Sequence, residues 1–205
     1  MSITVLIILI TVVTSWQGFS QPGFTHKYMF NAYQVIHRKE WYRMVTHGFL
    51  HADWGHLAFN MLSFYSFGES IERVFKGIFG ETQGIIYYLF LYFGAMIFSS
   101  LYSLVKHKNN SYYNALGASG AVSAIIFTFI LIAPSSRMYV FFLPMNSLLY
   151  GIVFLALSYY MSKKNMDNIG HDAHFWGAVF GFVFPIILQP MLLDNFIMQV
   201  NQMLH

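Results

Sequence analysis

Charged residues are scarce in this chain of 205 residues: Asp, Glu, Lys and Arg make up 9% of it, whereas hydrophobic residues make up 57%. Soluble domains carry about 25% charged residues, so eleven basic and eight acidic side chains cannot cover a water-facing surface of this size. Lipid is therefore the predicted solvent for most of the chain. The net charge of +3 is small and no basic run exceeds two residues, which gives nucleic-acid binding no support.

Cysteine is absent altogether. Its absence excludes disulfides, thiolate metal sites and a cysteine nucleophile. Alternation of apolar and polar residues, the pattern of a membrane β-barrel, is also missing, because the apolar segments are hydrophobic on all sides. Helices are the remaining structure that satisfies every backbone group within a bilayer.

Six apolar segments approach the roughly 20 residues that a membrane-spanning helix needs. The expected helices are 2–19, 54–75, 84–105, 118–133, 138–161 and 173–193. The first segment lacks the positive start of a signal peptide, so we interpret it as a retained helix. The fold class predicted is an all-α membrane protein, a six-transmembrane-helix bundle in one domain over 1–205. The connection 20–53 is the longest, and 134–137 is expected to be a tight turn.

Polar side chains within apolar helices are costly and need a reason. His56, Asn60, Ser119 and His174 each lie within about two turns of the start of the second, fourth or sixth expected helix. Alternate spans run in the same direction, so these four residues are predicted to meet at one depth near one membrane face. For His56 and Asn60, four residues apart on one helix face, packing hydrogen bonds are the alternative interpretation.

Ser119 lies among small residues, in Gly117-Ala118-Ser119-Gly120, and a serine in such a place is often only a packing position. His174 is followed by Gly177 and Gly181, and these offsets of three and seven place all three on one helix stripe. Two flat helices packed against each other would bring Ser119 within reach of His174. A nucleophile beside a base is the minimum for acyl-transfer chemistry.

Other chemistries find less support. Asp172 precedes His174 by two residues and is interpreted as a helix N-cap, so no acidic third member is predicted. His47 and His51 are four apart, but the chain has no His-Glu-x-x-His pattern, so neither zinc nor any other cofactor is predicted. A transporter or channel would show ionisable residues at mid-membrane or a duplicated half, and neither is visible.

The chain resembles the rhomboid proteases over nearly its whole length. Five pieces occur in that family's order, namely Trp41-Tyr42-Arg43, Phe49-Leu50-His51 with His56-Leu57-Ala58-Phe59-Asn60, Phe67-Gly68 with Glu72-Arg73, Gly117-Ala118-Ser119-Gly120, and Ala173-His174 with Gly177 and Gly181. Each piece alone is weak, but all five in order form a specific signal. The pieces mark Trp41, Arg43, His51 and Glu72 as family motif positions.

The resemblance implies an intramembrane serine endopeptidase that cleaves transmembrane segments of other proteins in the lipid bilayer. Ser119 would be the nucleophile and His174 the base, and Asn60 and His56 would hold the oxyanion with the Ser119 amide. Ser123 departs from the family pattern, where a large residue packs under the histidine. A catalytically inactive, client-binding relative is the alternative, although such a protein is expected to have lost Ser119 or His174.

Two arguments about orientation disagree. Eight basic residues are expected on the side of the site, namely Lys27, Arg38, Lys39, Arg43, Lys106, Lys108, Lys163 and Lys164. Three are expected on the other side, namely Arg73, Lys76 and Arg137. The positive-inside rule would place the site in the cytoplasm, whereas the resemblance implies a bacterial inner membrane with the site facing outside. We favour the resemblance, because four of the eight charges lie in the long first connection, which in the family is a folded element.

Overall fold

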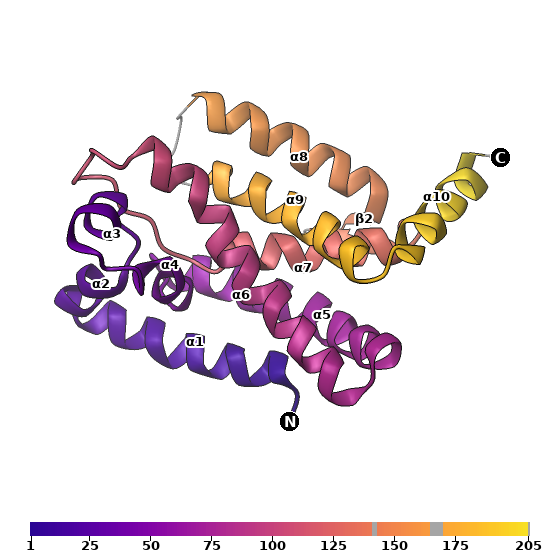
Figure 1. Ribbon diagram of the computed structural model, residues 1–205, viewed down its shortest axis with the longest axis horizontal. Coiled ribbons are helices and arrows are strands. Elements are labelled where there is room, and N and C mark those ends of the chain that lie inside the picture. The colour runs from indigo at the N-terminus through magenta and orange to yellow at the C-terminus, as the bar shows by residue number, and fades with distance from the viewer. Residues whose placement is uncertain (141–142, 165–169, 205) are drawn as a thin grey trace.

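The computed structural model describes residues 1–140, 143–164 and 170–204, and most of them are helical. The long helices lie side by side in a bundle (Figure 1). They are α1 (Ile3–Ser20), α5 (Trp54–Phe79), α6 (Glu81–Lys106), α7 (Ser119–Ile132), α8 (Ser147–Lys164) and α9 (His171–Leu188). By length and composition α1, α6 and α9 can each cross a membrane, while α7 and most of α8 are shorter apolar helices. The count of six spans stays a prediction.

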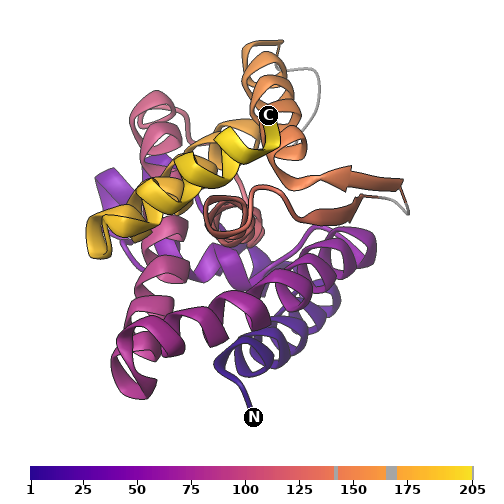
Figure 2. The same ribbon diagram turned by 90° about the vertical axis from the view of Figure 1, so that its right-hand side faces the viewer.

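Helix α7 lies at the centre of the bundle, where Figure 2 shows it end-on with other helices around it. It packs against α9, α6 and α5. Ala121, Ala124, Ile125 and Leu131 are completely buried. A helix that is apolar on all sides belongs inside a protein, and this position explains why 14 residues suffice for α7.

The backbones of α7 and α9 touch at two glycines. A Cβ atom at Gly177 would lie 2.1 Å from the carbonyl oxygen of Gly120, and one at Gly181 would lie 2.1 Å from that of Ala124. Thr128 Oγ1 also donates a hydrogen bond to the Gly181 carbonyl at 2.7 Å. The small residues of the two segments predict this close packing.

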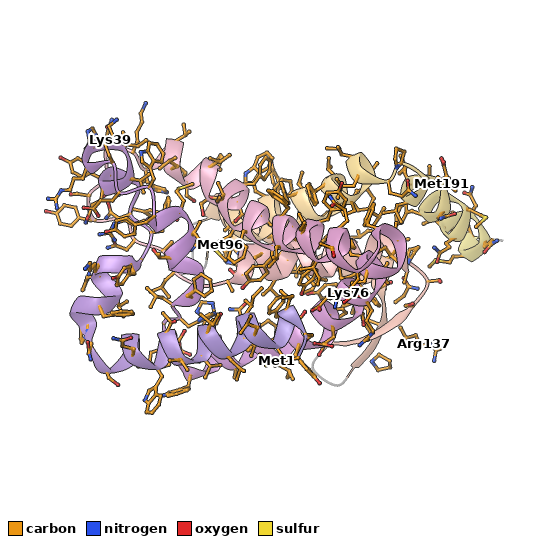
Figure 3. The ribbon with its side chains drawn as sticks, turned by 60° about the horizontal axis from the view of Figure 1, so that its bottom comes forward. Met1, Lys39, Lys76, Met96, Arg137 and Met191 are labelled. Carbon is orange, nitrogen blue, oxygen red and sulfur yellow. The ribbon has the colours of Figure 1, made fainter. Side chains whose placement is uncertain are left out.

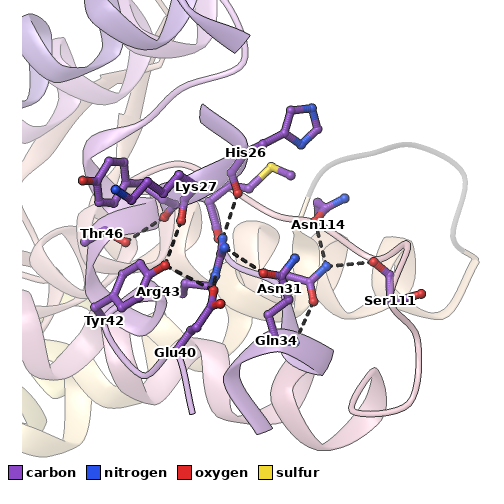
Figure 4. A network of polar contacts seen from close by, with 12 residues as sticks. His26, Lys27, Asn31, Gln34, Glu40, Tyr42, Arg43, Thr46, Ser111 and Asn114 are labelled. Atoms are coloured by element: carbon purple, nitrogen blue, oxygen red, sulfur yellow. Dashed lines mark hydrogen bonds and ion pairs between the residues drawn. The ribbon is translucent and has the colours of Figure 1, made fainter. Parts of the chain in front are cut away.

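The first connection is itself folded, around a buried arginine. It contains α2 (Pro22–Tyr28), α3 (Ala32–Arg38), α4 (Arg43–Thr46) and the 3-10 helix η1 (His47–Phe49). The Arg43 side chain is buried and donates to Glu40 Oε2 at 2.6 Å and to Gln34 Oε1 at 2.8 Å. It also donates to the carbonyls of His26 and Met29 (Figure 4). Four acceptors on one guanidinium fix this connection as a rigid element.

Trp41 and Asn31 also belong to the first connection. Trp41, from the same motif as Arg43, is half exposed. Asn31 Nδ2 donates to the Ser111 carbonyl and to Asn114 Oδ1, each at 2.9 Å, which ties the first connection to the segment before α7 (Figure 4). The two loops at this end of the bundle are therefore joined.

A β-hairpin takes the place of the start of the helix expected at 138–161, whereas the tight turn expected at 134–137 is present as a turn at Pro134 and Ser135 before the first strand. Strand β1 (Arg137–Val140) pairs antiparallel with β2 (Leu143–Asn146), and α8 begins only at Ser147. The helix was wrongly expected to begin at 138 because Pro144 disfavours a helix interior. Asn146 Oδ1 accepts from the Leu148 amide at 2.9 Å and so caps the helix that follows.

The last expected helix, 173–193, is also wrong at its C-terminal end. Helix α9 ends at Leu188, and a separate helix, α10 (Met191–Leu204), begins after Pro190. Proline lacks an amide proton, and its ring clashes with the preceding turn, so a continuous helix is disfavoured there. In Figure 2, α10 lies across the end of the bundle.

A buried carboxylate joins α5 to the start of α1. Glu72 is 2% exposed and accepts from the amide of Thr4 at 2.9 Å and its hydroxyl at 2.8 Å, and from the amide of Ile3 at 3.2 Å. Lys76 Nζ lies 3.0 Å from the same carboxylate. A negative charge at the first amides of a helix is stabilising. Figure 3 places Lys76 and Arg137 at one end of the molecule and Lys39 at the other, as span counting predicts.

Candidate active site

One cavity collects the polar residues singled out in the sequence. It has a volume of about 620 Å³ and lies where the N-terminal ends of α5, α7 and α9 meet. His56, Asn60, Ser119 and His174 all line it. Residues far apart in the sequence thus come together at one depth, as alternation of the spans predicts.

Ser119 is the first residue of α7, and the turn before it depends on glycine. Gly117 has φ of +121°, a conformation that side-chain-bearing residues rarely adopt. Its amide donates to the His47 carbonyl at 3.0 Å, which fixes the turn to η1. Among the described residues, no side chain caps the N-terminus of α7. The amides of its first turn are therefore the natural place for a negative charge.

His56 lies directly against this turn. A Cβ atom at Gly117 would lie 2.8 Å from Cε1 and 3.1 Å from Nε2 of the His56 ring. Asp53 caps α5 by accepting from the His56 amide at 2.8 Å. One turn further along, the buried Asn60 donates through Nδ2 to the His56 carbonyl at 3.2 Å. Two side chains that can donate hydrogen bonds therefore face the cavity from α5, opposite the start of α7.

His174 lies in the first turn of α9 between two aromatic neighbours. The Phe154 ring of α8 is 6.0 Å away and the His171 ring is 5.8 Å away, both measured between ring centroids. Ser123 is buried within α7 and offers no ring to the histidine. These two contacts of His174 come from α8 and from α9 itself, which no sequence offset from Ser119 could have shown.

Asp172 is not the N-cap expected from the sequence. Helix α9 begins at His171 with Gly170 as its N-cap, so Asp172 already lies in the first helical turn. Its carboxylate is 3.2 Å from Lys106 Nζ and accepts a hydrogen bond from Ser162 Oγ. Asp172 thus links the ends of α6 and α8 to α9, as a helical position two residues from His174 allows.

His47 and His51 serve different partners. His47 Nε2 is 3.2 Å from Ser100 Oγ, and burial lowers the pKa of His47 to about 4. His51 Nδ1 is 3.0 Å from Ser15 Oγ, and the His51 ring lies 4.9 Å from the His56 ring between centroids. Within the described part of the chain, no three His, Cys, Asp or Glu residues gather where they could hold a metal ion.

Sequence reasoning missed the serines of α6. Three serines, Ser99, Ser100 and Ser103, line the cavity. Ser99 also packs closely on α7, because a Cβ atom added at Gly120 would lie 2.3 Å from the hydroxyl oxygen of Ser99. The sequence did indicate these residues, because three serines within five residues are unusual in an otherwise apolar segment. Polar groups at helix contacts in a membrane call for an explanation.

The chain is similar in sequence to several known proteins. Residues 38–191 match the model of the Rhomboid domain. The chain is 28% identical over 183 residues to the RHOMBOID-like protein 12, mitochondrial, of Arabidopsis thaliana. This match covers 82% of this chain and 52% of that protein. It is 31% identical over 146 residues to the Rhomboid protease GluP of Bacillus subtilis, covering 71% of this chain and 26% of that protein.

A human relative, the Presenilin-associated rhomboid-like protein, mitochondrial, is 30% identical over 148 residues, which cover 67% of this chain and 35% of that protein. The chain therefore spans about half the length of the plant relative and about a third or less of the human protein and GluP. The family match includes His56, Asn60, Ser119 and His174 and extends over most of the described bundle. The chain belongs to the rhomboid family.

Proposed function

We propose that this protein is an intramembrane serine endopeptidase that uses a dyad of Ser119 and His174. The observation that carries the proposal is the backbone contact between α7 and α9, where Gly177 meets Gly120. Gly120 directly follows Ser119, and Gly177 lies three residues after His174. The contact therefore holds the starts of both helices together at the cavity that both side chains line.

In the proposed reaction, Ser119 Oγ attacks the scissile carbonyl carbon while His174 accepts the hydroxyl proton. The tetrahedral intermediate collapses when the C–N bond breaks, and His174 returns the proton to the leaving amine. Water then attacks the acyl-enzyme ester, with His174 again as base, and releases the carboxylic acid and free Ser119. No metal or other cofactor is needed at any step.

The oxyanion of each tetrahedral intermediate would form beside the Gly117 turn. The Ser119 amide at the start of α7 is one proposed donor, and the side chains of His56 and Asn60 are the others. All three residues line the cavity, and His56 is held against Gly117 by the fold itself. Donors that are fixed before the reaction stabilise developing charge best where water is limited.

Both the substrate and water can reach this position. The cavity lies at the ends of the helices rather than at their middle, and the exposed residues Asp53 and Asn114 form part of its lining. Hydrolysis requires such an aqueous opening. The surrounding helices are apolar, so the proposed substrates are transmembrane segments of other membrane proteins.

The alternative is a relative that binds membrane proteins without cutting them. The test is incubation of purified protein in liposomes with a helical transmembrane substrate, alongside Ser119→Ala. Cleavage by the natural sequence and its loss in the variant would support the proposal. Binding of the substrate without any cleavage by the natural sequence would establish the alternative.

We further propose a bacterial cell membrane location with the cavity facing outside. Arg43, one of the four basic residues of the first connection, is buried among neutral and acidic partners, which supports treating that connection as a folded element. Without that connection, four basic residues face three, which decides nothing. Asn110→Cys should react with a membrane-impermeant maleimide in intact cells, whereas Arg137→Cys should react only after lysis. The opposite pattern would reverse the orientation.

A further inference from the structure

The surface of helix α10 has three sides, which differ in their side chains and neighbours. Toward the bundle, Leu192 is buried, the Phe196 ring meets Phe182 of α9 at 5.2 Å between centroids, and Gln199 Nε2 donates to the Ile132 carbonyl at 3.0 Å. The last contact places α10 at the C-terminal end of α7, the end opposite Ser119. A helix held there lies at the level of the membrane face remote from the cavity.

A second side of α10 is apolar and exposed. Leu193, Ile197 and Leu204 are 37%, 49% and 77% exposed. Their spacing of four and seven residues places them in one stripe along the helix. On the opposite side lie Asn195 and Gln202, seven residues apart and both exposed. The exposed Met191 and Met198 lie beside these two amides, so that side is mixed, whereas the stripe carries no polar side chain.

An apolar surface of the bundle extends as far as α10. Val183 and Ile187 of α9 are 46% and 71% exposed, as expected of residues that face lipid in a helix apolar enough to cross a membrane. Between α8 and α9 lies a groove of about 320 Å³ with an almost wholly apolar lining, and Phe196 of α10 forms part of its wall. The lipid-facing surface of α9 therefore reaches α10 without a polar break at this groove.

We propose that α10 is an interfacial helix, which lies along the membrane–water boundary with the stripe of Leu193, Ile197 and Leu204 on the acyl chains of the bilayer. Figure 2 shows α10 across the end of the bundle, the course that such a helix requires. Helices of this kind carry one apolar and one polar side and lie in the plane of the interface. The bilayer thereby holds the C-terminal ends of α7 and α9 at a fixed depth.

The absence of cysteine permits a direct test in the full-length protein. Ile197→Cys and Asn195→Cys are matched variants, because both side chains are exposed and they lie on opposite sides of α10. Each is reconstituted in phosphatidylcholine–phosphatidylglycerol liposomes, labelled with a bimane fluorophore, and titrated with lipid that carries a nitroxide on its acyl chain. Unlabelled samples are treated with a charged maleimide.

The Ile197→Cys label should be quenched several-fold more strongly than the Asn195→Cys label, and its thiol should react several-fold more slowly with the charged maleimide. Leu204→Cys against Gln202→Cys repeats the comparison about two turns further along. Equal reactivity and no quenching at both positions would place α10 in water and overturn the proposal. A disulfide-linked dimer of Ile197→Cys, shielded from lipid and maleimide alike, would overturn it in favour of a second copy of the chain.

Discussion

The two ends of the bundle treat their polar side chains differently. At one end, histidine, asparagine and serine side chains surround a cavity of about 620 Å³. At the other, Glu72 is enclosed by two amides and one hydroxyl of α1 and by Lys76, and the hydroxyl of Thr4 is also 2.6 Å from that of Tyr88. The first end leaves room for another molecule, whereas the second has its groups paired within the chain.

The difference distinguishes polar residues that can take part in a reaction from polar residues that stabilise the fold. A buried polar group is costly unless it is paired. Pairing explains Glu72 completely, so no further role is needed for it. The polar side chains at the other end line an open volume, which a substrate can occupy. Substitutions at the two ends should therefore fail in different ways, by loss of reaction at one end and loss of stability at the other.

The largest expected effect is at the dyad. Ser119→Ala and His174→Ala should each lower turnover on the order of 10⁴-fold or more, because nucleophile and base act as a unit. Thermal unfolding of the variants should stay close to that of the natural sequence. Ser123→Ala, the same change one turn along α7, is the control and should keep most activity. Substantial cleavage by Ser119→Ala would refute the assigned nucleophile.

Asn60→Ala should come next. Loss of one oxyanion donor lowers turnover by about 10²–10³-fold, because the interaction forms only in the transition state. The Michaelis constant should change little, and steady-state kinetics with one transmembrane substrate separate the two parameters. If turnover were normal and only apparent affinity fell, Asn60 would be a binding or packing residue.

Gly181→Val tests the backbone contact between α7 and α9. A side chain at Gly181 would meet the backbone of Ala124, and overpacking of this kind costs about 1–3 kcal/mol or more. A lower unfolding temperature in detergent and a matching loss of activity are expected. Gly77→Ala in α5 is the control, since a Cβ atom there meets nothing within 4 Å. Equal stability of both variants would contradict the close α7–α9 packing.

Glu72→Ala tests the paired end. Hydrogen bonds to charged groups contribute about 1.5–3 kcal/mol, so this variant should unfold at a lower temperature than the natural sequence. Glu72→Gln, which keeps one acceptor oxygen, should lose less. Per folded molecule, turnover should be unchanged in both, because the carboxylate lies far from the cavity along α5. A selective fall in turnover with normal unfolding would remove the distinction between the two ends.

The smallest expected effect is on the pH dependence of stability, through Glu40 of the first connection. The hydrogen bond from Arg43 holds the pKa of the Glu40 carboxyl below its ordinary value. A carboxyl with a lowered folded-state pKa adds stability above its unfolded pKa, and this stability is lost as pH falls through the folded-state pKa. The stability difference between the natural sequence and Glu40→Gln should therefore be small at neutral pH and vanish in acid. A difference that is the same at every pH would mean that charge plays no part.

Sequence reasoning located the site better than the opposite end of the bundle. Glycine spacing predicted the contact of α7 with α9, because small residues have one strong reason to recur at helical intervals. The hairpin at β1 and β2 was missed, because a short apolar run does not distinguish strand from helix. Pro144 and Pro190 were the signals overlooked, and each stands where an expected helix was wrong.

Within the site, side-chain partners were the unpredictable part. Convergence of Ser119 and His174 follows from counting spans, since direction alternates along the chain. The neighbours Phe154 and Lys106 come from other helices, and their contacts depend on how α8 and α6 are rotated. No sequence interval records that rotation, so the expected capping role of Asp172 was wrong and its pairing with Lys106 was not foreseen.

Covalent labelling of the natural sequence with a serine-directed fluorophosphonate tests the central claim most directly. Only a serine activated by a base within a preorganised oxyanion site reacts readily with such a reagent. We expect that one residue, Ser119, carries the label by peptide mass spectrometry, and that His174→Ala remains folded but unlabelled. Labelling of another serine, or undiminished labelling of Ser119 in His174→Ala, would contradict it.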